Sequence, residues 1–416
     1  MATPHRTAVE LASFKSFYKG THRLVEPEKT VKRVWCLAPV MGITRIANVT
    51  GLDTIGVPVV TVCRPNSRSI AVSQGKGLTI AAAKASGLME SVEGYHAERI
   101  MLPLKLASYE ELRYTHEVAN ISQLPQPTSG IFHSNLPLLW IEGYDLIKES
   151  RIWVPYEMVH LNHTVPLPTG TGCFVASSSG LASGNHPLEA ISHAICEVVE
   201  RDAVTLWGLK DHVAQHETRM DLDSVDDSDC RMMLERYNRA GVGVAAWEIT
   251  SDIGIPAFLC VATECSPNPL RPLPSALGYG CHPARSIALL RALTEAAQSR
   301  LTYISGIRDD LGRNAYEHSL SPELSENDRA LMCARGPMRK FRDVPSFDSP
   351  DFKEDVSWEL DRLHSAGISS VIVVDLTKAE FNLPVVRIVI PTLEPKDSIS
   401  EHVPGSRARA LVRKRV

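Results

Sequence analysis

The spacing of apolar positions along the chain predicts three long helices and several buried strands. Residues 78–100, 187–208 and 283–306 are rich in Ala, Leu and Ile and read with helical periodicity. Runs of β-branched residues bounded by Gly or Pro predict strands within residues 51–67, 136–146, 151–161, 369–377 and 383–391. Because helices and strands follow one another without a strict βαβ order, the pattern favours an α+β fold.

The remaining segments refine this outline. The apolar runs 241–250 and 255–263 are separated by a turn-like SDIG sequence, which predicts an antiparallel hairpin. A further helix is expected over 352–367, and the polar stretch 306–350 is expected to be rich in loops. We expect an N-terminal segment at 1–44, one domain over 45–395 and a basic tail at 396–416.

The helix over residues 187–208 carries three carboxylates on one face. Glu189, Glu197 and Glu200 fall within about 80° of one another on a helix that turns ~100° per residue. Like charges at this spacing repel, so the stripe requires a cation close by.

A related pattern occurs in all three long helices, with polar residues at positions i, i+4 and i+7 on one face. The triplets are Ser86, Glu90 and Glu93; His193, Glu197 and Glu200; and Arg291, Glu295 and Gln298. Each helix follows a glycine-bearing segment (GKG, ASGN or GYG), which we expect to form a turn whose backbone N–H groups approach a phosphate.

The neighbours of these carboxylates indicate what the cation is. They are mostly Ala, Leu, Ile and Val, so an unpaired carboxylate there would face a large desolvation cost. Carboxylate oxygens suit Mg²⁺, and their number indicates two or more ions. Arg201 and Arg291 would suit phosphate oxygens, and Lys76 adds a point charge. The sequence therefore predicts a Mg-nucleotide held by three acidic helices over a β-sheet, although no GxxxxGK[ST] motif is present.

Composition excludes several other classes of protein. The chain is 44% hydrophobic and 22% charged, with a net charge of -4, which is typical of a globular protein and gives no reason to expect nucleic acid. Its nine cysteines are scattered without a CxxC motif, as in proteins with reduced thiols. We expect a cytoplasmic protein, because the chain has neither a membrane-spanning apolar run nor a signal-peptide pattern.

Three motifs follow one another along the chain: GKGLTIAAAKASGLMESVE, SSSGLASGNHPLEAISHAICEVVERDA and GYGCHPARSIALLRALTEAAQSR. Together they resemble the YcaO family, and the resemblance covers about residues 45–395. It implies an ATP-dependent enzyme that acts on the backbone amide of a peptide. It implies Mg²⁺ ligands at Glu90, Glu93, Glu197 and Glu200, and ATP contacts at Ser86, Asn185, Glu189, Arg201, Arg291 and Glu295. Lys19 is an additional candidate phosphate contact.

The chain departs from the family pattern at Gly94, where the first motif usually continues with arginine. Lys76 or Arg99 is a candidate replacement for the missing cation. His193 is read as a structural histidine beside the carboxylates, and no catalytic side chain is assigned.

The reaction implied by the resemblance begins when a nucleophile adds to the amide carbonyl carbon. The resulting oxyanion attacks the γ-phosphate of ATP, and phosphate leaves with the former amide oxygen. A Cys, Ser or Thr side chain of the peptide would give an azoline, external sulfide a thioamide, and an amine an amidine.

The tail, PGSRARALVRKRV, lacks the proline-rich PxPxP ending common among azoline formers, and the chain looks like the subgroup found with a TfuA partner. We therefore favour thioamide formation in a ribosomally synthesised peptide or protein, with a TfuA-like protein helping to deliver sulfur to a homodimeric enzyme. An azoline-forming cyclodehydratase, a non-catalytic ATP- or peptide-binding accessory protein and a structural scaffold remain alternatives.

Overall fold

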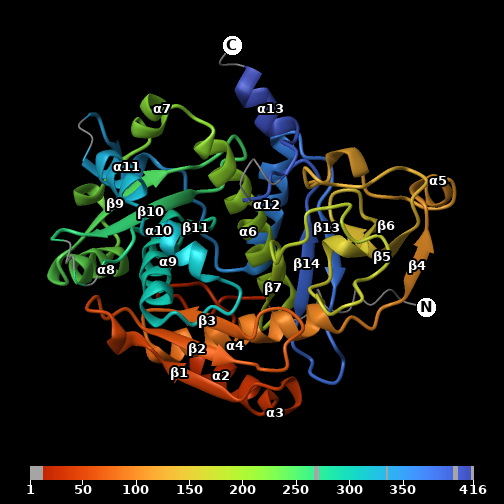
Figure 1. The fold of residues 1–416 in the computed structure, drawn as a ribbon, viewed down its shortest axis with the longest axis horizontal. Coiled ribbons are helices and arrows are strands. Elements are labelled where there is room, and N and C mark those ends of the chain that lie inside the picture. The colour runs from red at the N-terminus through yellow and green to blue at the C-terminus, as the bar shows by residue number, and fades with distance from the viewer. Residues whose placement is uncertain (1–12, 267–269, 271, 334–335, 397–401, 414–416) are drawn as a thin grey trace. The chain divides into compact units, whose positions relative to one another are not determined.

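The computed structural model describes residues 13–266, 270, 272–333, 336–396 and 402–413 (Figure 1). The chain divides into two compact units, each made of non-contiguous segments. Unit 1 comprises Met1–Glu26, Val92–Thr205 and Asp348–Val416, and unit 2 comprises Pro27–Ser91 and Leu206–Phe347. The predicted domain boundaries at 45 and 395 stay a prediction, and residues 1–12, 397–401 and 414–416 of the two flanking segments lie outside the described residues.

Unit 1 contains a six-stranded antiparallel sheet in the order β4-β5-β13-β14-β7, with β6 paired to β5. Its strands are β4 (Leu104–Ala107), β5 (Leu138–Asp145), β6 (Ser150–Pro155), β7 (Leu181–Ser183), β13 (Ile372–Asp375) and β14 (Val385–Val389). Its helices are α5 (Tyr109–Leu112), α6 (Pro187–Gly208, which continues into unit 2), α12 (Phe352–Ser365) and α13 (Ser406–Arg413), with 3₁₀ turns at Ile121–Gln123 and Tyr156–Met158.

The β-branched runs of the sequence become the centre of this sheet. All five residues of β14 are buried, although one of them is an arginine. A strand that pairs on both sides and is covered on both faces reads as a continuous apolar run, which is why the pattern identified it as buried.

Unit 2 contains two three-stranded antiparallel sheets, β1-β2-β3 and β11-β10-β9, and a parallel pair, β12-β8. The strands are β1 (Arg45–Asn48), β2 (Val59–Cys63), β3 (Val72–Lys76), β8 (Met220–Asp221), β9 (Val242–Glu248), β10 (Ala257–Glu264), β11 (Ala276–Cys281) and β12 (Arg339–Lys340). The helices are α2 (Pro27–Trp35), α3 (Ala38–Met41), α4 (Ile80–Glu98, which continues into unit 1), α7 (His212–His216), α8 (Ser228–Arg239), α9 (Arg285–Ser305), α10 (Arg313–Ser319) and α11 (Pro322–Cys333). Short 3₁₀ turns lie at Thr50–Leu52, Leu222–Ser224 and Phe341–Asp343.

The hairpin predicted from the SDIG turn is confirmed, because β9 and β10 pair antiparallel. β10 also pairs with β11, so it is the central strand of its sheet. Helix α9 lies against β10 and β11, as Figure 1 shows, and its apolar face joins α8 in the core of unit 2. Core side chains include Met233, Tyr237, Phe258, Leu289 and Leu293.

The glycines of two motifs do not form the expected turns. Gly75 lies within β3, and Gly278 and Gly280 lie within β11. A Cβ at Gly280 would lie 2.1 Å from the carbonyl oxygen of Ala288 in α9, and one at Gly75 would lie 2.0 Å from that of Ala83 in α4. The turn prediction is therefore wrong for Gly75, Gly278 and Gly280, whereas Gly77 lies in the bend between β3 and α4. The strand glycines allow a helix to pack directly on a strand.

The expectation that residues 306–350 are rich in loops is confirmed only in part. Helices α10 and α11 occupy much of this stretch, and a proline opens α11 at a position where helices tolerate it. α10 has no buried residue. A helix without an apolar face gives no hydrophobic periodicity, so the pattern did not predict it.

No helix among the described residues combines the length and apolar character that a membrane crossing requires.

Candidate functional site

Two carboxylates of α6 share one arginine. Nη2 of Arg201 lies 3.2 Å from Oε1 of Glu197, and Nη1 lies 3.1 Å from Oε1 of Glu200. Glu200 is buried and Glu197 is half-buried. The guanidinium offsets the repulsion between these two carboxylates, so Arg201 is one of the cations that the acidic stripe requires.

Glu189, in the first turn of α6, contacts the N-terminal segment. Its carboxylate is 2% exposed and accepts the backbone N–H of Leu24 at 3.0 Å, while Nε of Arg23 lies 3.6 Å away. Burial raises the pKa of Glu189, and Arg23 and the hydrogen bonds from Leu24 and Asn185 oppose that rise. The predicted nucleotide contacts Asn185 and Glu189 are therefore brought together.

The cation that the structure places beside Glu189 is Arg23, which the sequence reasoning missed although it follows Lys19 in the same YKGTHR stretch. Lys19 itself is exposed. In the described part of the chain, its side chain makes no hydrogen bond or ion pair.

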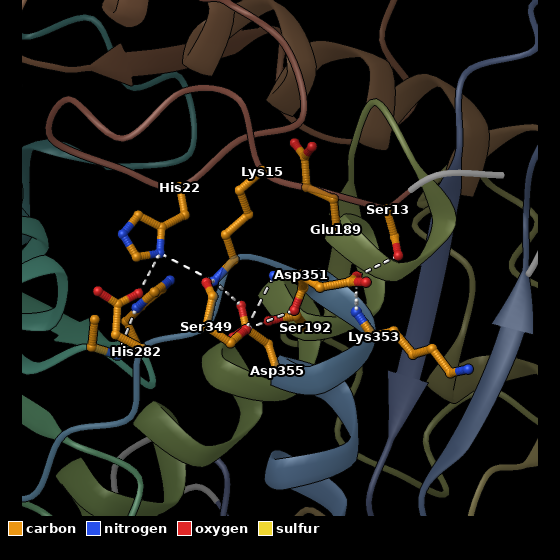
Figure 2. A network of polar contacts seen from close by, with 12 residues as sticks. Ser13, Lys15, His22, Glu189, Ser192, His282, Ser349, Asp351, Lys353 and Asp355 are labelled. Carbon is orange, nitrogen blue, oxygen red and sulfur yellow. Dashed lines mark hydrogen bonds and ion pairs between the residues drawn. The ribbon is translucent and has the colours of Figure 1, made fainter.

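A buried network anchors this N-terminal segment (Figure 2). Nζ of Lys15 lies 2.6 Å from Oδ2 of Asp355 and donates to the carbonyl oxygen of Ser349 at 2.8 Å. The Ser13 hydroxyl donates to Asp351 at the start of α12. The partners are more than 300 residues apart in the chain, so no local pattern indicated them.

The first acidic stripe lies on α4, which continues from unit 2 into unit 1. Ser86 and Glu90 are exposed, and Glu93 is half-buried. Oε1 of Glu93 accepts hydrogen bonds from the backbone N–H of Ser183 (2.8 Å) and from its hydroxyl (2.7 Å). These bonds hold the Glu93 side chain against strand β7.

The third stripe lies on α9 in unit 2. Nζ of Lys76, at the end of β3, lies 2.7 Å from Oε2 of Glu295 and 3.0 Å from Oε1 of Gln298. Two predicted nucleotide contacts, Lys76 and Glu295, thus meet as an ion pair. Arg291, one turn earlier, is half-buried.

Arg99, a candidate replacement for the cation missing at Gly94, makes two local contacts. Nη1 of Arg99 lies 2.8 Å from Oε2 of Glu98, and the guanidinium carbon of Arg99 lies 4.5 Å from the centroid of the Tyr95 ring. In unit 2 the pKa of Arg308 is raised, chiefly by its hydrogen bond to Asp310, and the charge of Glu90 contributes to the rise. Arg308 is therefore a cation near the first stripe that the sequence reasoning did not identify.

The donor chemistry of the acidic helices fits Mg²⁺, because all four predicted ligands are carboxylates. Within the described residues, no three His, Cys, Asp or Glu side chains already converge as a metal site. Glu197 and Glu200 contact Arg201, and Glu93 contacts Ser183, so a metal ion would replace existing partners. In strand β14, burial lowers the pKa of Arg387 to about 10, and the charge of Glu197 opposes this lowering.

Known proteins resemble this chain over most of its length. An uncharacterized protein in the tfuA 3′ region of Rhizobium leguminosarum bv. trifolii is 36% identical over 382 residues, which cover 89% of this chain and 88% of that protein. A solved structure described as a heterocyclase in complex with substrate and cofactor superposes with a TM-score of 0.75 at 24% identity. The match covers 94% of this chain, and this chain spans only about half (55%) of the heterocyclase.

A second solved structure is that of YcaO from Methanopyrus kandleri bound with AMPPCP and Mg²⁺. It superposes with a TM-score of 0.73 at 22% identity and covers 92% of this chain and 95% of its own length. At these identities the two structures establish the fold, and the α+β prediction is confirmed.

The model of one protein family matches residues 74–394, and its description reads "YcaO cyclodehydratase, ATP-ad Mg2+-binding". The match includes the three helices with acidic stripes and the strands β13 and β14. The prediction of ATP and Mg²⁺ as ligands is confirmed at the level of the family. The chain belongs to the YcaO family.

Proposed function

We propose that this protein is an ATP-dependent enzyme that phosphorylates the oxygen of a peptide backbone amide, and that its product is a thioamide. The observation that carries the first part is the family match over residues 74–394, which includes all three acidic helices. The second part is supported by the 36% identical relative in the tfuA 3′ region.

In this proposal, Glu90, Glu93, Glu197 and Glu200 hold Mg²⁺, which offsets the charge of the nucleotide phosphates. Arg201 contacts Glu197 and Glu200 in the structure. When Mg²⁺ takes those carboxylates, Arg201 is released to donate to phosphate oxygens, as a planar guanidinium can do through two parallel hydrogen bonds.

The remaining proposed ATP contacts are Lys19, Lys76, Ser86, Asn185, Glu189, Arg291 and Glu295. Lys76 and Glu295 hold each other in place, so each is positioned before ATP arrives.

The atoms of the reaction balance with sulfide as the nucleophile. Sulfide adds to the amide carbon, and the oxyanion that forms attacks the γ-phosphorus of ATP and releases ADP. The C–O bond then breaks, phosphate leaves with the oxygen, and the sulfur loses its proton to solvent as the C=S bond forms. The protein contributes positioning and charge neutralisation, so the proposal needs no nucleophilic side chain from this chain.

An azoline-forming cyclodehydratase is the second candidate. It is favoured by the word cyclodehydratase in the family description and by the heterocyclase that shares the fold. In either case we expect a peptide or protein substrate, a homodimer and a cytoplasmic location, and for the thioamide product a TfuA-like partner that delivers sulfur.

One incubation distinguishes the two products. The enzyme, a precursor peptide encoded beside its gene, ATP, Mg²⁺, sulfide and any adjacent TfuA-like protein are combined, and the peptide is examined by mass spectrometry. A thioamide adds ~16 Da, the difference between sulfur and oxygen, with stoichiometric ADP. Loss of ~18 Da without sulfide, which is one water, would establish azoline formation instead.

The matched variants are Glu197→Gln and Glu200→Gln, which remove a charge at similar volume. Both should abolish Mg²⁺-dependent ATP turnover while the protein stays folded. Glu235→Gln is the control, because Glu235 pairs with Arg239 on the exposed side of α8. Wild-type turnover in both α6 variants would contradict the proposed metal site.

A further inference from the structure

A buried lysine fixes the N-terminal segment of unit 1 to the start of α12. The side chains of Lys15 and Asp355 are 1% and 0% exposed, and Nζ of Lys15 lies 2.6 Å from Oδ2 of Asp355. The same ammonium donates to the carbonyl oxygen of Ser349 at 2.8 Å and lies 3.3 Å from Nδ1 of His22 (Figure 2). Burial and the charge of Lys15 lower the pKa of His22 to about 4, so its Nδ1 accepts. All three donors of the ammonium therefore have an acceptor.

The backbone reinforces this anchor. The N–H of Lys15 donates to the carbonyl oxygen of Pro350 at 2.8 Å, and the N–H of Phe352 donates to that of Ser13 at 3.1 Å. The Ser13 hydroxyl donates to Asp351. Side-chain and main-chain contacts together hold residues 13–15 against the first turn of α12.

Directly after the anchor, the chain turns back on itself. The N–H of Phe17 donates to the carbonyl oxygen of Arg23 at 3.1 Å, and the N–H of Arg23 donates to that of Phe17 at 2.9 Å. Gly20, at the tip, has a φ of 74°, which glycine adopts without strain. Residues 16–24 thus form a short closed hairpin, and Lys19 is exposed at its tip.

The hairpin is held at its second end by α6. The Ser16 hydroxyl donates to the carbonyl oxygen of Leu24 at 2.6 Å, and the N–H of Leu24 donates to the buried carboxylate of Glu189 at 3.0 Å. Lys19 therefore lies on a loop that is fixed to α12 before it and to α6 after it. A cation that is already held in place loses little freedom when it binds an anion.

We propose that Lys15 is a positioning residue, which with Asp355 holds the hairpin so that Lys19 meets the phosphates of the nucleotide. The inference rests on the proposed function, in which Lys19 and Glu189 are ATP contacts. A buried ion pair adds little net stability, because the cost of desolvating two charges is comparable with their attraction, but it specifies one geometry. We therefore expect the pair to affect the position of Lys19 more than the stability of the fold.

Two variants of the ion pair separate position from folding. Lys15→Met leaves the carboxylate of Asp355 buried without its cation, so it should lower the thermal midpoint strongly. Lys15→Met combined with Asp355→Asn leaves neither charge of the pair in place and should recover most of the midpoint. The combined variant should still bind the non-hydrolysable ATP analogue AMPPCP with Mg²⁺ about tenfold more weakly than the wild type. Wild-type affinity in the combined variant would overturn the inference.

Calorimetry in a Lys19→Gln background tests whether the ion pair acts through Lys19. Lys19→Gln removes the ammonium and should itself weaken AMPPCP binding by about tenfold. In that background the combined variant should cause little further loss, because the hairpin no longer carries the cation, and additive losses would contradict the proposal. Lys353→Met is the control, since Lys353 is exposed on the same helix as Asp355. It should leave AMPPCP affinity unchanged, and an equal loss there would remove the specific role of Lys15.

A measurement without nucleotide distinguishes a failure of this inference from a failure of the proposed function. Trypsin cleaves after Lys19 when the hairpin leaves its contacts with α12 and α6, because cleavage requires a locally opened segment. Mass spectrometry of the digest should show this cut several-fold faster in the combined variant and unchanged in Lys353→Met. An unchanged rate in the combined variant would show that Lys15 does not hold the hairpin. If the wild type binds no AMPPCP, the proposed nucleotide site and the phosphate contact of Lys19 are wrong, and the rate of the cut still decides whether Lys15 fixes the hairpin.

Discussion

Arg201 contacts two glutamates of the acidic stripe, and the planar shape of its guanidinium allows both contacts at once. Arg201 contacts Glu197 and Glu200 through different nitrogens, which a lysine ammonium does not reproduce. We predict that Arg201→Lys or Arg291→Lys lowers ATP affinity or turnover by about tenfold, or about 1.4 kcal/mol. Steady-state kinetics and calorimetry with ATP measure the loss. Unchanged values in both lysine variants would mean that these arginines are structural.

We predict that the titration of Glu359 in α12 makes the free energy of unfolding depend on pH. It is fully buried, accepts hydrogen bonds from the Ser192 hydroxyl (2.6 Å) and the Cys196 thiol (3.4 Å), and burial raises its pKa well above the usual value. Its folded-state pKa is above its unfolded-state pKa, so the folded state binds the proton more tightly. Its contribution to stability is therefore present below the unfolded pKa of about 4.3 and is lost as pH rises toward the folded pKa.

Glu359→Gln removes this titration. We expect the thermal midpoint of the variant, relative to the wild type, to rise between pH 5 and pH 8. Glu354→Gln is the control, because Glu354 lies on the same helix and is exposed. A difference between Glu359→Gln and the wild type that stays constant with pH would show that Glu359 ionises normally in the folded protein.

At the scale of elements, the contact of α9 with β11 depends on the missing side chain of Gly280. A Cβ there would lie 2.1 Å from the carbonyl oxygen of Ala288 and 2.8 Å from Cβ of Arg291. We predict that Gly280→Ala lowers the free energy of unfolding by ~1–3 kcal/mol, because backbone on both sides must shift. It should also reduce ATP turnover, since α9 carries Arg291 and Glu295.

Urea denaturation measures the effect of Gly280→Ala on stability. The control is Gly208→Ala at the end of α6, where no atom of the described residues outside the local helix backbone lies within 4 Å of the added Cβ. Alanine there should be neutral or stabilising by up to about 1 kcal/mol. Equal stability of the two alanine variants would contradict the close approach of α9 to β11.

At the scale of the whole molecule, ATP and Mg²⁺ should stabilise the chain as one combined ligand. A ligand that binds only the folded state stabilises it by ~2.7 kcal/mol at 100 times its Kd. We predict a larger rise in thermal midpoint with ATP and Mg²⁺ together than the sum of the rises with each alone. The excess should disappear in Glu197→Gln, and an excess that persists there would place the metal elsewhere.

The local pattern predicted much of the fold correctly. Helical periodicity indicated α4, α6, α9 and α12, and β-branched runs indicated β2, β5, β6, β13 and β14. Strand β3, which contains Gln, Gly and Lys, was read as a turn, and β11 was misread for its glycines. A helix packs on the glycines of each of these strands. This contact joins two separate elements, so the local sequence pattern does not indicate it.

The sequence by itself determined which residues share a helical face, because a spacing of i, i+4 and i+7 repeats with the turn of the helix. It therefore identified Glu197, Glu200 and Arg201, and with them the chemistry of carboxylates and a guanidinium. Only the tertiary structure decided the long-range partners, which are Lys76 with Glu295 and Arg23 with Glu189. The physical reason is that the members of each pair are 166 or more residues apart in the chain, and they come within a few ångströms of each other only when sheets and helices pack.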